Sequence, residues 1–533
     1  MKTTKYIFSA LAASAILSLT SCVQDLDVTP IDPNKNTAEM ALTSEADYQA
    51  FLAGIYTGYA TSGYKGPNDD PSIKGLDGGM SQYIRGLFHL CELSTDVYVC
   101  GWNDEGVPDV CQMNWDASTG LIYSIYSRIF FQISQCNELI RQAQNTTVSL
   151  TKKDQYIAEA RAMRAMSYYH AIDNFGNVPF ADETSIVGQI PEQISRADLY
   201  AWLETEMRDL IDNSALPEPG KGEYGRIDKG AVKFLLAKLY LNAGVYTGTA
   251  QWQKCADVLK DLMDDGYSLH TVSRGSVYSP YQELFLADND KCTDEIIFAV
   301  EQDGNDTQSY GATNYLVFAF TGGSMNVDDL GITSGWEGCR MTEQFYNKFD
   351  TNKDQRAIFW TDGQSVSVNA MGDFTNGIAF QKYKNVQSDG TIPNREWNEK
   401  DGKWINPGFV NTDFPMMRYA DVLLMAAECA ARGASIDGLS AYNEVRARAG
   451  MPAANSLNLN EILDERAREL YLELWRRQDL VRYDKYTSGD YVWDWKGGVR
   501  DGQGVESYKN LFPLPTSDLM VNPNLVQNDG YKK

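Results

Sequence analysis

Nine stretches of the chain carry apolar residues three to four positions apart, and this helical periodicity limits the fold more than any other feature. The first stretch, SEADYQAFLAGIYTGYA at residues 44–60, opens with a serine suited to cap a helix. The others lie at residues 118–144, 151–176, 195–213, 229–246, 250–266, 415–433, 435–450 and 459–483. We therefore predict a mainly α fold.

Several of these segments combine a face of small residues with a following tyrosine, as in ARAMRAMSYY and AKLYLNAGVY. Small residues allow two helices to approach closely. Helix pairs of this size look like tetratricopeptide (TPR) units, although the period is loose. We expect about four such pairs to form a curved superhelical scaffold.

Between residues 267 and 412 the composition changes to Gly, Asn, Asp, Thr and Ser, with short β-branched runs such as EIIFAV at residues 295–300. A loop region of this length is uncommon in a compact protein and is usually functional. We expect a single domain at 44–533. Helical repeats at about 118–266 and 415–483 would frame the loop-rich region 267–412, which would carry the ligand site.

The N-terminal stretch MKTTKYIFSALAASAILSLTSC is typical of a secretory signal peptide, with two lysines before a short apolar run. Its end, LTSC, resembles the bacterial lipobox, in which the cysteine is acylated and becomes the first residue. We predict a lipoprotein signal peptide at 1–21 and an acylated leader at 22–43, anchored to a membrane through Cys22. No other segment is long and apolar enough to span a bilayer.

The chain is strongly acidic, with a formal charge of −25, and loss of Lys2 and Lys5 with the signal peptide would take it to −27. Such a surface repels nucleic acid and anionic lipid headgroups, which excludes nucleic-acid binding. Aromatic residues make up 12% of the chain, more than a core alone usually requires. A neutral, polyhydroxylated ligand fits both observations.

Hydrolytic chemistry has no support in the sequence. Of the three histidines, His170 falls in the apolar register of a helix, and neither of the others stands near a serine or cysteine of nucleophile-elbow type. Besides Cys22, eight cysteines are scattered without a CxxC pair, which predicts buried thiols; one disulfide among Cys91, Cys100 and Cys111 stays open. We predict a protein that is not an enzyme and requires no cofactor.

Two tryptophans stand in loops that offer them little to pack against. Trp336 ends the stretch GITSGW, and Trp102 lies in VCGWNDEG, each directly after a glycine and beside polar side chains. An exposed indole face can stack on the C–H face of a sugar ring, while neighbouring polar groups meet the hydroxyls. The alternative is that each tryptophan packs into the core.

Several motifs together resemble the SusD/RagB family, the surface glycan-binding lipoproteins of Bacteroidetes. They are EARAMRAMSYYHAIDNFGNVPF, RYADVLLMAAE, ERARELYLELWRRQDLVRY and FPLPTSDL, in the order and spacing of the family. The resemblance covers the chain from Cys22 to its end. It implies a SusD-like fold that does no chemistry, sits on a SusC-like TonB-dependent transporter in the outer membrane at the cell surface, and hands oligosaccharides to it.

Within the family, the starch-binding member is the most similar, through VQDLD, LYLNAGVYTG, LFLADND and DYVWDWKGG. This resemblance places Trp102, Tyr310 and Trp336 on an arc of three stacking aromatic residues. Three rings in a curve suit an α-1,4-glucan, which is naturally helical, better than a flat β-glucan. The implied ligand is starch or a maltooligosaccharide.

The same resemblance implies polar contacts to the glucose hydroxyls from Asp77 and Arg85. A third contact is expected near Glu105. The sequence departs from the family there, because Cys100 replaces a second tryptophan and the following loop is one residue shorter. That departure puts the role of Glu105 in doubt.

The resemblance also implies a structural calcium site at Asp290, Asn411 and Asp413, in two oxygen-rich loops. The alternative is that these residues form turns. Two functional alternatives stay open as well: the same fold binding another glycan or peptides, and, from a different class, a surface glycosidase.

Overall fold

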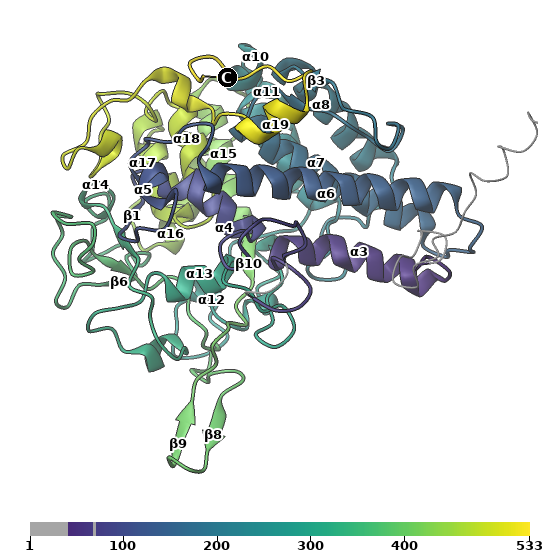
Figure 1. Cartoon of the computed structure of the whole chain (residues 1–533). Helices are drawn as coiled ribbons and strands as arrows, with labels where there is room; N and C mark the ends of the chain where they lie inside the picture. Colours follow the sequence, from purple (N-terminus) through teal and green to yellow (C-terminus); the bar gives the residue numbers. More distant parts are fainter. Residues whose placement is uncertain (1–40, 68–70, 533) are drawn as a thin grey trace, which may run out of the picture.

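The computed structural model describes residues 41–67 and 71–532 of the chain (Figure 1). The predicted signal peptide, Cys22 and nearly all of the predicted leader lie outside these residues. Helices dominate, and in the part described each sheet has two strands. The predicted mainly α fold is confirmed, whereas the division at residue 44 stays a prediction.

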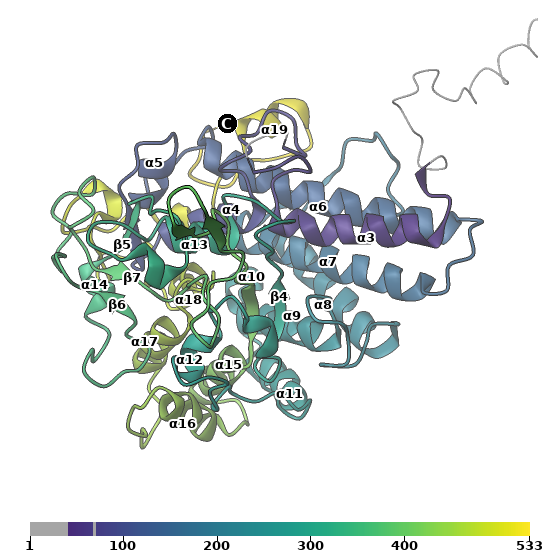
Figure 2. The ribbon, with the colours of Figure 1, turned by 90° about the horizontal axis from the view of Figure 1, so that it is seen from below.

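The long helices form one continuous stack, seen side by side from α3 to α8 in Figure 2. Helix α6 packs on α3 and α7, α7 on α8, α8 on α9, and α9 on α11; α15 then contacts α11, α16 and α17. The stack contains α3 (Glu45–Ala60), α6 (Gly120–Asn145), α7 (Lys153–Asn174), α8 (Arg196–Asn213), α9 (Lys229–Leu241), α10 (Ala243–Thr247), α11 (Trp252–Met263), α15 (Tyr419–Ala431), α16 (Gly438–Arg448) and α17 (Leu459–Leu470).

Short polar side chains fix where these helices begin. Ser44 and Asp47 form a reciprocal capping box at the start of α3. The side chains of Ser195 and Asp228 accept backbone N–H groups at the starts of α8 and α9. The helical pattern of the sequence and its capping residues therefore agree.

The predicted helix at 415–433 is wrong in its first turn. Residues Phe414–Arg418 form strand β10, which pairs antiparallel with β4 (Ile296–Val300), and α15 begins only at Tyr419. All five residues of each strand are buried. Periodicity does not separate a short buried strand from a buried helix turn, which explains the error.

The predicted helix at 459–483 is also wrong, because it is two helices. Helix α17 ends at Leu470 and α18 (Arg476–Arg482) follows a break in which Leu472 and Leu474 have φ values of 58° and 76°. The Lys382 ammonium donates to the carbonyl of Tyr471 at 2.6 Å, so a distant side chain replaces a helical hydrogen bond. The tertiary structure overrides a strong local pattern here.

The remaining elements are short and connect the stack to the loop-rich region, from which the hairpin of β8 and β9 projects (Figure 1). The helical ones are α4 (Tyr83–Phe88), η1 (His89–Leu93), α5 (Val107–Cys111), α12 (Pro280–Glu283), η2 (Asn289–Lys291), α13 (Ala312–Phe318), η3 (Val327–Leu330), α14 (Glu343–Tyr346), η4 (Lys496–Gly498), η5 (Ser507–Asn510) and α19 (Thr516–Val521). The strands are β1 (Tyr98–Cys100), β2 (Val178–Pro179), β3 (Gln193–Ile194), β5 (Cys339–Met341), β6 (Phe359–Trp360), β7 (Ala379–Phe380), β8 (Glu396–Asn398) and β9 (Lys403–Ile405).

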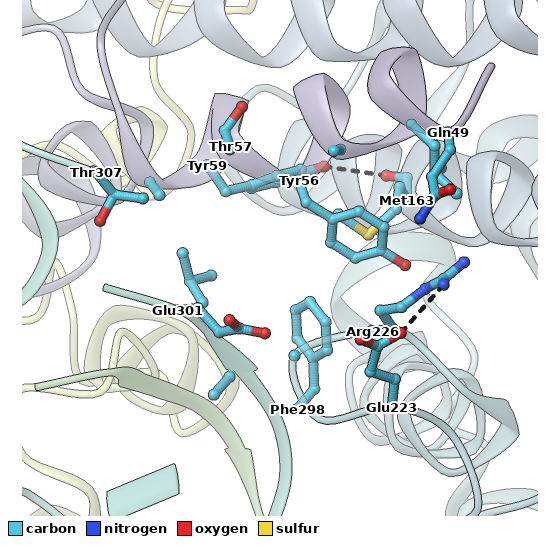
Figure 3. A pocket seen from close by; sticks show the side chains of 16 residues that line it. Gln49, Tyr56, Thr57, Tyr59, Met163, Glu223, Arg226, Phe298, Glu301 and Thr307 are labelled. Atoms are coloured by element: carbon cyan, nitrogen blue, oxygen red, sulfur yellow. Dashed lines mark hydrogen bonds and ion pairs between the residues drawn. The ribbon is translucent and has the colours of Figure 1, made fainter. Parts of the chain in front are cut away.

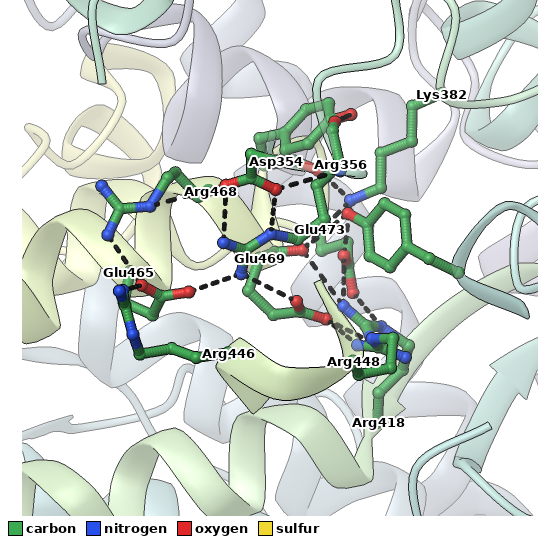
Figure 4. A network of polar contacts seen from close by, with 12 residues as sticks. Asp354, Arg356, Lys382, Arg418, Arg446, Arg448, Glu465, Arg468, Glu469 and Glu473 are labelled. Carbon is green, nitrogen blue, oxygen red and sulfur yellow. Dashed lines mark hydrogen bonds and ion pairs between the residues drawn. The ribbon is translucent and has the colours of Figure 1, made fainter. Parts of the chain in front are cut away.

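A buried network of charged side chains joins α17 to β10 and to the loops around residues 354 and 382 (Figure 4). Its centre is Glu469, which pairs with Arg356 at 3.2 Å, with Arg418 at 3.0 Å and with Arg448. All four side chains are at most 2% exposed. Each charge is therefore compensated without water.

The eight cysteines from Cys91 onward are free and buried. The predicted buried thiols are thus confirmed, and the disulfide left open among Cys91, Cys100 and Cys111 does not form. Within residues 41–67 and 71–532, no helix combines the length and the apolar character needed to cross a bilayer.

Candidate functional site

A short two-stranded ladder brings the two loop tryptophans together. Trp102 follows strand β1 and Trp336 precedes strand β5, and these strands pair antiparallel with Cys100 opposite Cys339. The ladder continues beyond Cys100, since the Gly101 N–H donates to the Gly338 carbonyl at 2.9 Å. Antiparallel pairing therefore places residues that are more than 230 positions apart in sequence at one edge.

The three aromatic residues predicted to form an arc lie in a row, which we call the aromatic arc: Trp102, Trp336 and Tyr310. The ring centroids of Trp102 and Trp336 are 6.3 Å apart with the planes inclined by 48°. Those of Trp336 and Tyr310 are 5.7 Å apart, inclined by 68°. All three side chains are partly exposed. Each ring is therefore tilted relative to its neighbour, and Trp336 stands in the middle because it contacts both of the others.

The rings of the arc are held from behind. The Trp102 indole N–H donates to the Trp336 carbonyl at 3.2 Å, and Trp336 packs on Phe318 of α13 at a centroid distance of 5.1 Å. Gly338 lies against the Trp102 indole so closely that a Cβ there would stand 2.3 Å from Cε2. The arc is therefore a preorganised surface with supported rings.

Phe409 extends this row, and the sequence interpretation missed it. Its ring lies 5.6 Å from that of Tyr310, and its side chain is partly exposed. A signal was present, because Phe409, Trp336 and Trp102 each follow a glycine directly in a loop.

Arg85 connects the arc to helix α4. One guanidinium nitrogen, Nη1, donates to the carbonyls of Gly79 and Tyr310, both at 3.0 Å. The guanidinium carbon lies 5.7 Å from the ring centroid of Trp102 and 4.8 Å from that of Tyr315. Arg85 is only 5% exposed. Its geometry suits positioning of Tyr310 more than direct contact with a ligand.

The other predicted polar residues are on the surface. Asp77 is exposed and its Oδ1 accepts the Met80 N–H at 2.7 Å, in the turn that also contains Gly79. Glu105 is exposed in the loop after Trp102. Glu337, next to Trp336, is exposed and has a φ of 52°, a backbone conformation that residues other than glycine rarely adopt. Carboxylates around the arc disfavour an anionic ligand.

The residues of the predicted calcium site have other partners. The Asp413 carboxylate accepts the Tyr224 hydroxyl at 2.9 Å and the Gln302 N–H at 2.7 Å, and burial raises its pKa to about 7. The Asn411 side-chain oxygen accepts an N–H from Asn394, and Asp290 is exposed. In the ranges described, no group of three or more His, Cys, Asp or Glu side chains is placed to hold a metal ion. Because asparagine is not among these residue types, this absence does not test a set of two aspartates and Asn411, and the calcium site stays a prediction.

A cavity of about 270 Å³ lies between α3, β4 and the loop at 223–226 (Figure 3). Its polar lining includes Tyr56 and Arg226. The Tyr56 hydroxyl donates to the Glu159 carboxylate at 2.7 Å, and Nε of Arg226 donates to the same carboxylate at 3.0 Å. These groups already satisfy one another. The residues of the aromatic arc do not line this cavity, so it is a separate feature.

Comparison with known proteins finds relatives that match nearly the whole chain. Residues 294–531 match the sequence model of the SusD family. The chain is 32% identical to the starch-binding protein SusD of Bacteroides thetaiotaomicron, with 99% of this chain and 100% of that protein covered. It is 23% identical to SusD-like protein P2 of Formosa agariphila, covering 97% and 98%.

Solved structures share the fold. Surface glycan-binding protein A from Bacteroides uniformis has a TM-score of 0.68 at 22% identity, covering 91% of this chain and 99% of that one. Surface glycan-binding protein A from Bacteroides thetaiotaomicron, solved in complex with laminarihexaose, has a TM-score of 0.66 at 19% identity, covering 91% and 100%. At this identity the likeness extends to the fold alone.

Proposed function

Because the chain belongs to the SusD family, we propose that it binds starch and α-1,4-glucan oligosaccharides on the aromatic arc. The observation that carries this proposal is the row of three partly exposed, mutually tilted rings, Trp102, Trp336 and Tyr310. The starch-binding protein SusD, 32% identical over the whole chain, supports the choice of ligand.

The chemistry of such a site follows from the shape of the sugar. A glucose ring presents C–H faces, which gain from burial against an aromatic face and from its negative quadrupole. A helical glucan turns its rings progressively, as the arc turns its own. Exposed polar side chains such as Asp77 and Glu105 would meet the hydroxyl groups at the rim.

The test is a titration of the protein, lacking Cys22 and the residues before it, with maltoheptaose, a β-glucan oligosaccharide of similar length and a peptide mixture. Binding of maltoheptaose alone supports the proposal. Preferential binding of the β-glucan would favour the second candidate, another glycan, which is motivated by the laminarihexaose complex of a structural relative. Incubation with amylose should release no reducing ends, because we propose binding without hydrolysis.

Gly338→Ala should weaken maltoheptaose binding about ten-fold without unfolding the protein. An added Cβ would stand 2.3 Å from Cε2 of Trp102, so the indole must tilt out of the row. The measurement is a titration, with the thermal midpoint as the check on folding. A matched control is Gly372→Ala, where a Cβ meets nothing within 4 Å. Unchanged affinity in Gly338→Ala would contradict the assignment of Trp102.

We also propose that the protein is anchored to the outer membrane at the cell surface through acylated Cys22 and docks on a SusC-like TonB-dependent transporter. Exposed apolar side chains on two segments that contact each other support docking, because exposed apolar surface marks interaction sites. The loop between α7 and α8 contacts the C-terminal segment, because the Val526 N–H donates a hydrogen bond of 3.0 Å to the side-chain oxygen of Gln193. The exposed members of this C-terminal apolar patch are Ile186, Val187, Ile190, Met520, Val521 and Val526.

The double variant Val187→Asp/Val521→Asp should reduce recovery of the transporter about ten-fold or more when the lipoprotein is purified from solubilised outer membranes. Two carboxylates would have to be desolvated in the interface. Maltoheptaose affinity should not change. The control is Val272→Asp, which alters a valine of equal exposure, 76%, outside the patch. Full recovery of the transporter with the double variant would place its docking surface elsewhere.

A further inference from the structure

The β8–β9 hairpin, which projects from the rest of the molecule (Figure 1), carries two tryptophans on one face. The register pairs Trp397 directly with Trp404. Their ring centroids are 5.4 Å apart, inclined by 68°, and the side chains are 50% and 51% exposed. Every other tryptophan in the described residues is less exposed than these two.

Exposing these two indoles to water does not stabilise the fold. A two-stranded hairpin without further packing gains little stability by itself, and half of each indole stays in water. Large exposed aromatic surfaces mark binding sites more often than chance positions. The two exposed indoles therefore indicate a binding site.

The base of the hairpin is fixed to the segment that carries Trp336. The Asn406 side-chain amide donates to the Ile332 carbonyl at 3.1 Å and to Asp328 at 2.7 Å. Arg395, across the hairpin base, lies 3.5 Å from the same Asp328 carboxylate. The base of the hairpin is therefore held by the segment that leads to Trp336.

The other end of the hairpin leads to the arc as well. Three residues after Asn406, Phe409 packs against Tyr310 at 5.6 Å, and the Val410 N–H donates to Asn314 of α13 at 3.2 Å. Phe409, which extends the aromatic arc, therefore follows Trp404 of the hairpin by five residues in the chain.

The charge of the hairpin indicates which ligand suits it. Three cations and three carboxylates lie near the tryptophans, so residues 395–403 are neutral in a protein of charge −25. A neutral ligand gains most from two indole faces in such a setting. The charged members are Arg395, Glu396, Glu399, Lys400, Asp401 and Lys403.

We infer that Trp397 and Trp404 form a second stacking site, which holds the part of a long α-glucan that extends beyond the aromatic arc. This inference rests on the proposed function of the arc. It assigns to the hairpin a role in chain-length selection: long glucans contact both surfaces, whereas short oligosaccharides contact the arc alone.

The test compares maltoheptaose with a long linear amylose in wild-type protein and in Trp397→Ala/Trp404→Ala. We expect the double variant to lose about ten-fold in affinity for amylose and to keep its affinity for maltoheptaose. The conservative variant Trp397→Tyr/Trp404→Tyr should recover most of the loss, since it restores two aromatic faces. The thermal midpoint should stay constant, because the hairpin tip contributes nothing to the core.

Equal amylose affinity in wild type and the alanine variant would overturn the inference, and so would an equal loss of both ligands. Failure of the proposed function is distinguishable: the wild-type protein would then bind neither maltoheptaose nor amylose. If the hairpin instead contacts a partner protein, the alanine variant will bind amylose like the wild type.

Discussion

Trp336→Ala is expected to reduce the affinity for maltoheptaose by a factor of about 30 to 1,000. Trp336 is the middle ring of the aromatic arc, in contact with Trp102, Tyr310 and Phe318. Stacking a sugar on its indole buries apolar surface worth about 1.5–3 kcal/mol and adds about 0.5–1.5 kcal/mol from the aromatic face. Together these amount to about 2–4.5 kcal/mol, and the stated factor corresponds to about 2–4 kcal/mol because the indole is already partly buried.

The measurement is a titration of the variant by calorimetry, together with its thermal midpoint. Trp336→Phe should retain part of the affinity, because it keeps a smaller aromatic face. Trp252→Ala is the matched control: it removes another partly exposed indole, on α11, where Arg432 and not the arc is its neighbour. Wild-type affinity in Trp336→Ala would contradict the assignment of the arc.

Glu469→Ala is expected to lower the free energy of unfolding by about 3–5 kcal/mol, the usual cost of removing one partner from a buried ion pair. The variant leaves Arg356, Arg418 and Arg448 without their shared carboxylate, in the network of Figure 4. Denaturant unfolding followed by circular dichroism measures the change. Glu223→Ala is the control, because its side chain is 78% exposed and pairs with Arg226 only at 3.4 Å. If Glu469→Ala lowered the free energy of unfolding by less than about 1 kcal/mol, the network would not stabilise the fold as proposed.

The same carboxylate should affect the response of the protein to acid. Burial alone would raise the pKa of Glu469, but Arg448, Arg418 and Arg356 outweigh burial and lower that pKa to about 2 from an ordinary 4.5. A depressed pKa in the folded state contributes stability that is complete above the unfolded value and is lost as the pH falls through the folded value. Wild-type stability should therefore decline between about pH 4.5 and 2, and Glu469→Ala should show a smaller decline in that interval.

The sequence predicted the helical stack because apolar spacing and capping residues act locally. Ser44, which the sequence suggested as a cap, caps its helix in the structure, and Ser195 and Asp228 cap two others. The break after Leu470 could not be predicted in this way, because it depends on Lys382, a residue nearly 90 positions distant. Local pattern determines the elements, and distant partners determine where some of them stop.

The candidate site, too, was predictable only where its signal is local in the sequence. A loop indole after a glycine is visible in the sequence, and the family resemblance added Tyr310. The hairpin pair Trp397 and Trp404 was missed, because one tryptophan in a polar stretch has no meaning until the strand register places a second one opposite it. Arg85 stays a predicted ligand contact, and its burial and its bond to the Tyr310 carbonyl add a positioning role that the sequence does not show.

The crystal structure of the protein with bound maltoheptaose tests the central claim most directly. The account predicts that successive glucose rings lie flat on Trp102, Trp336 and Tyr310, with their C–H faces toward the aromatic rings. A maltoheptaose molecule bound in the cavity beside α3, or elsewhere with these three rings uncovered, would contradict it.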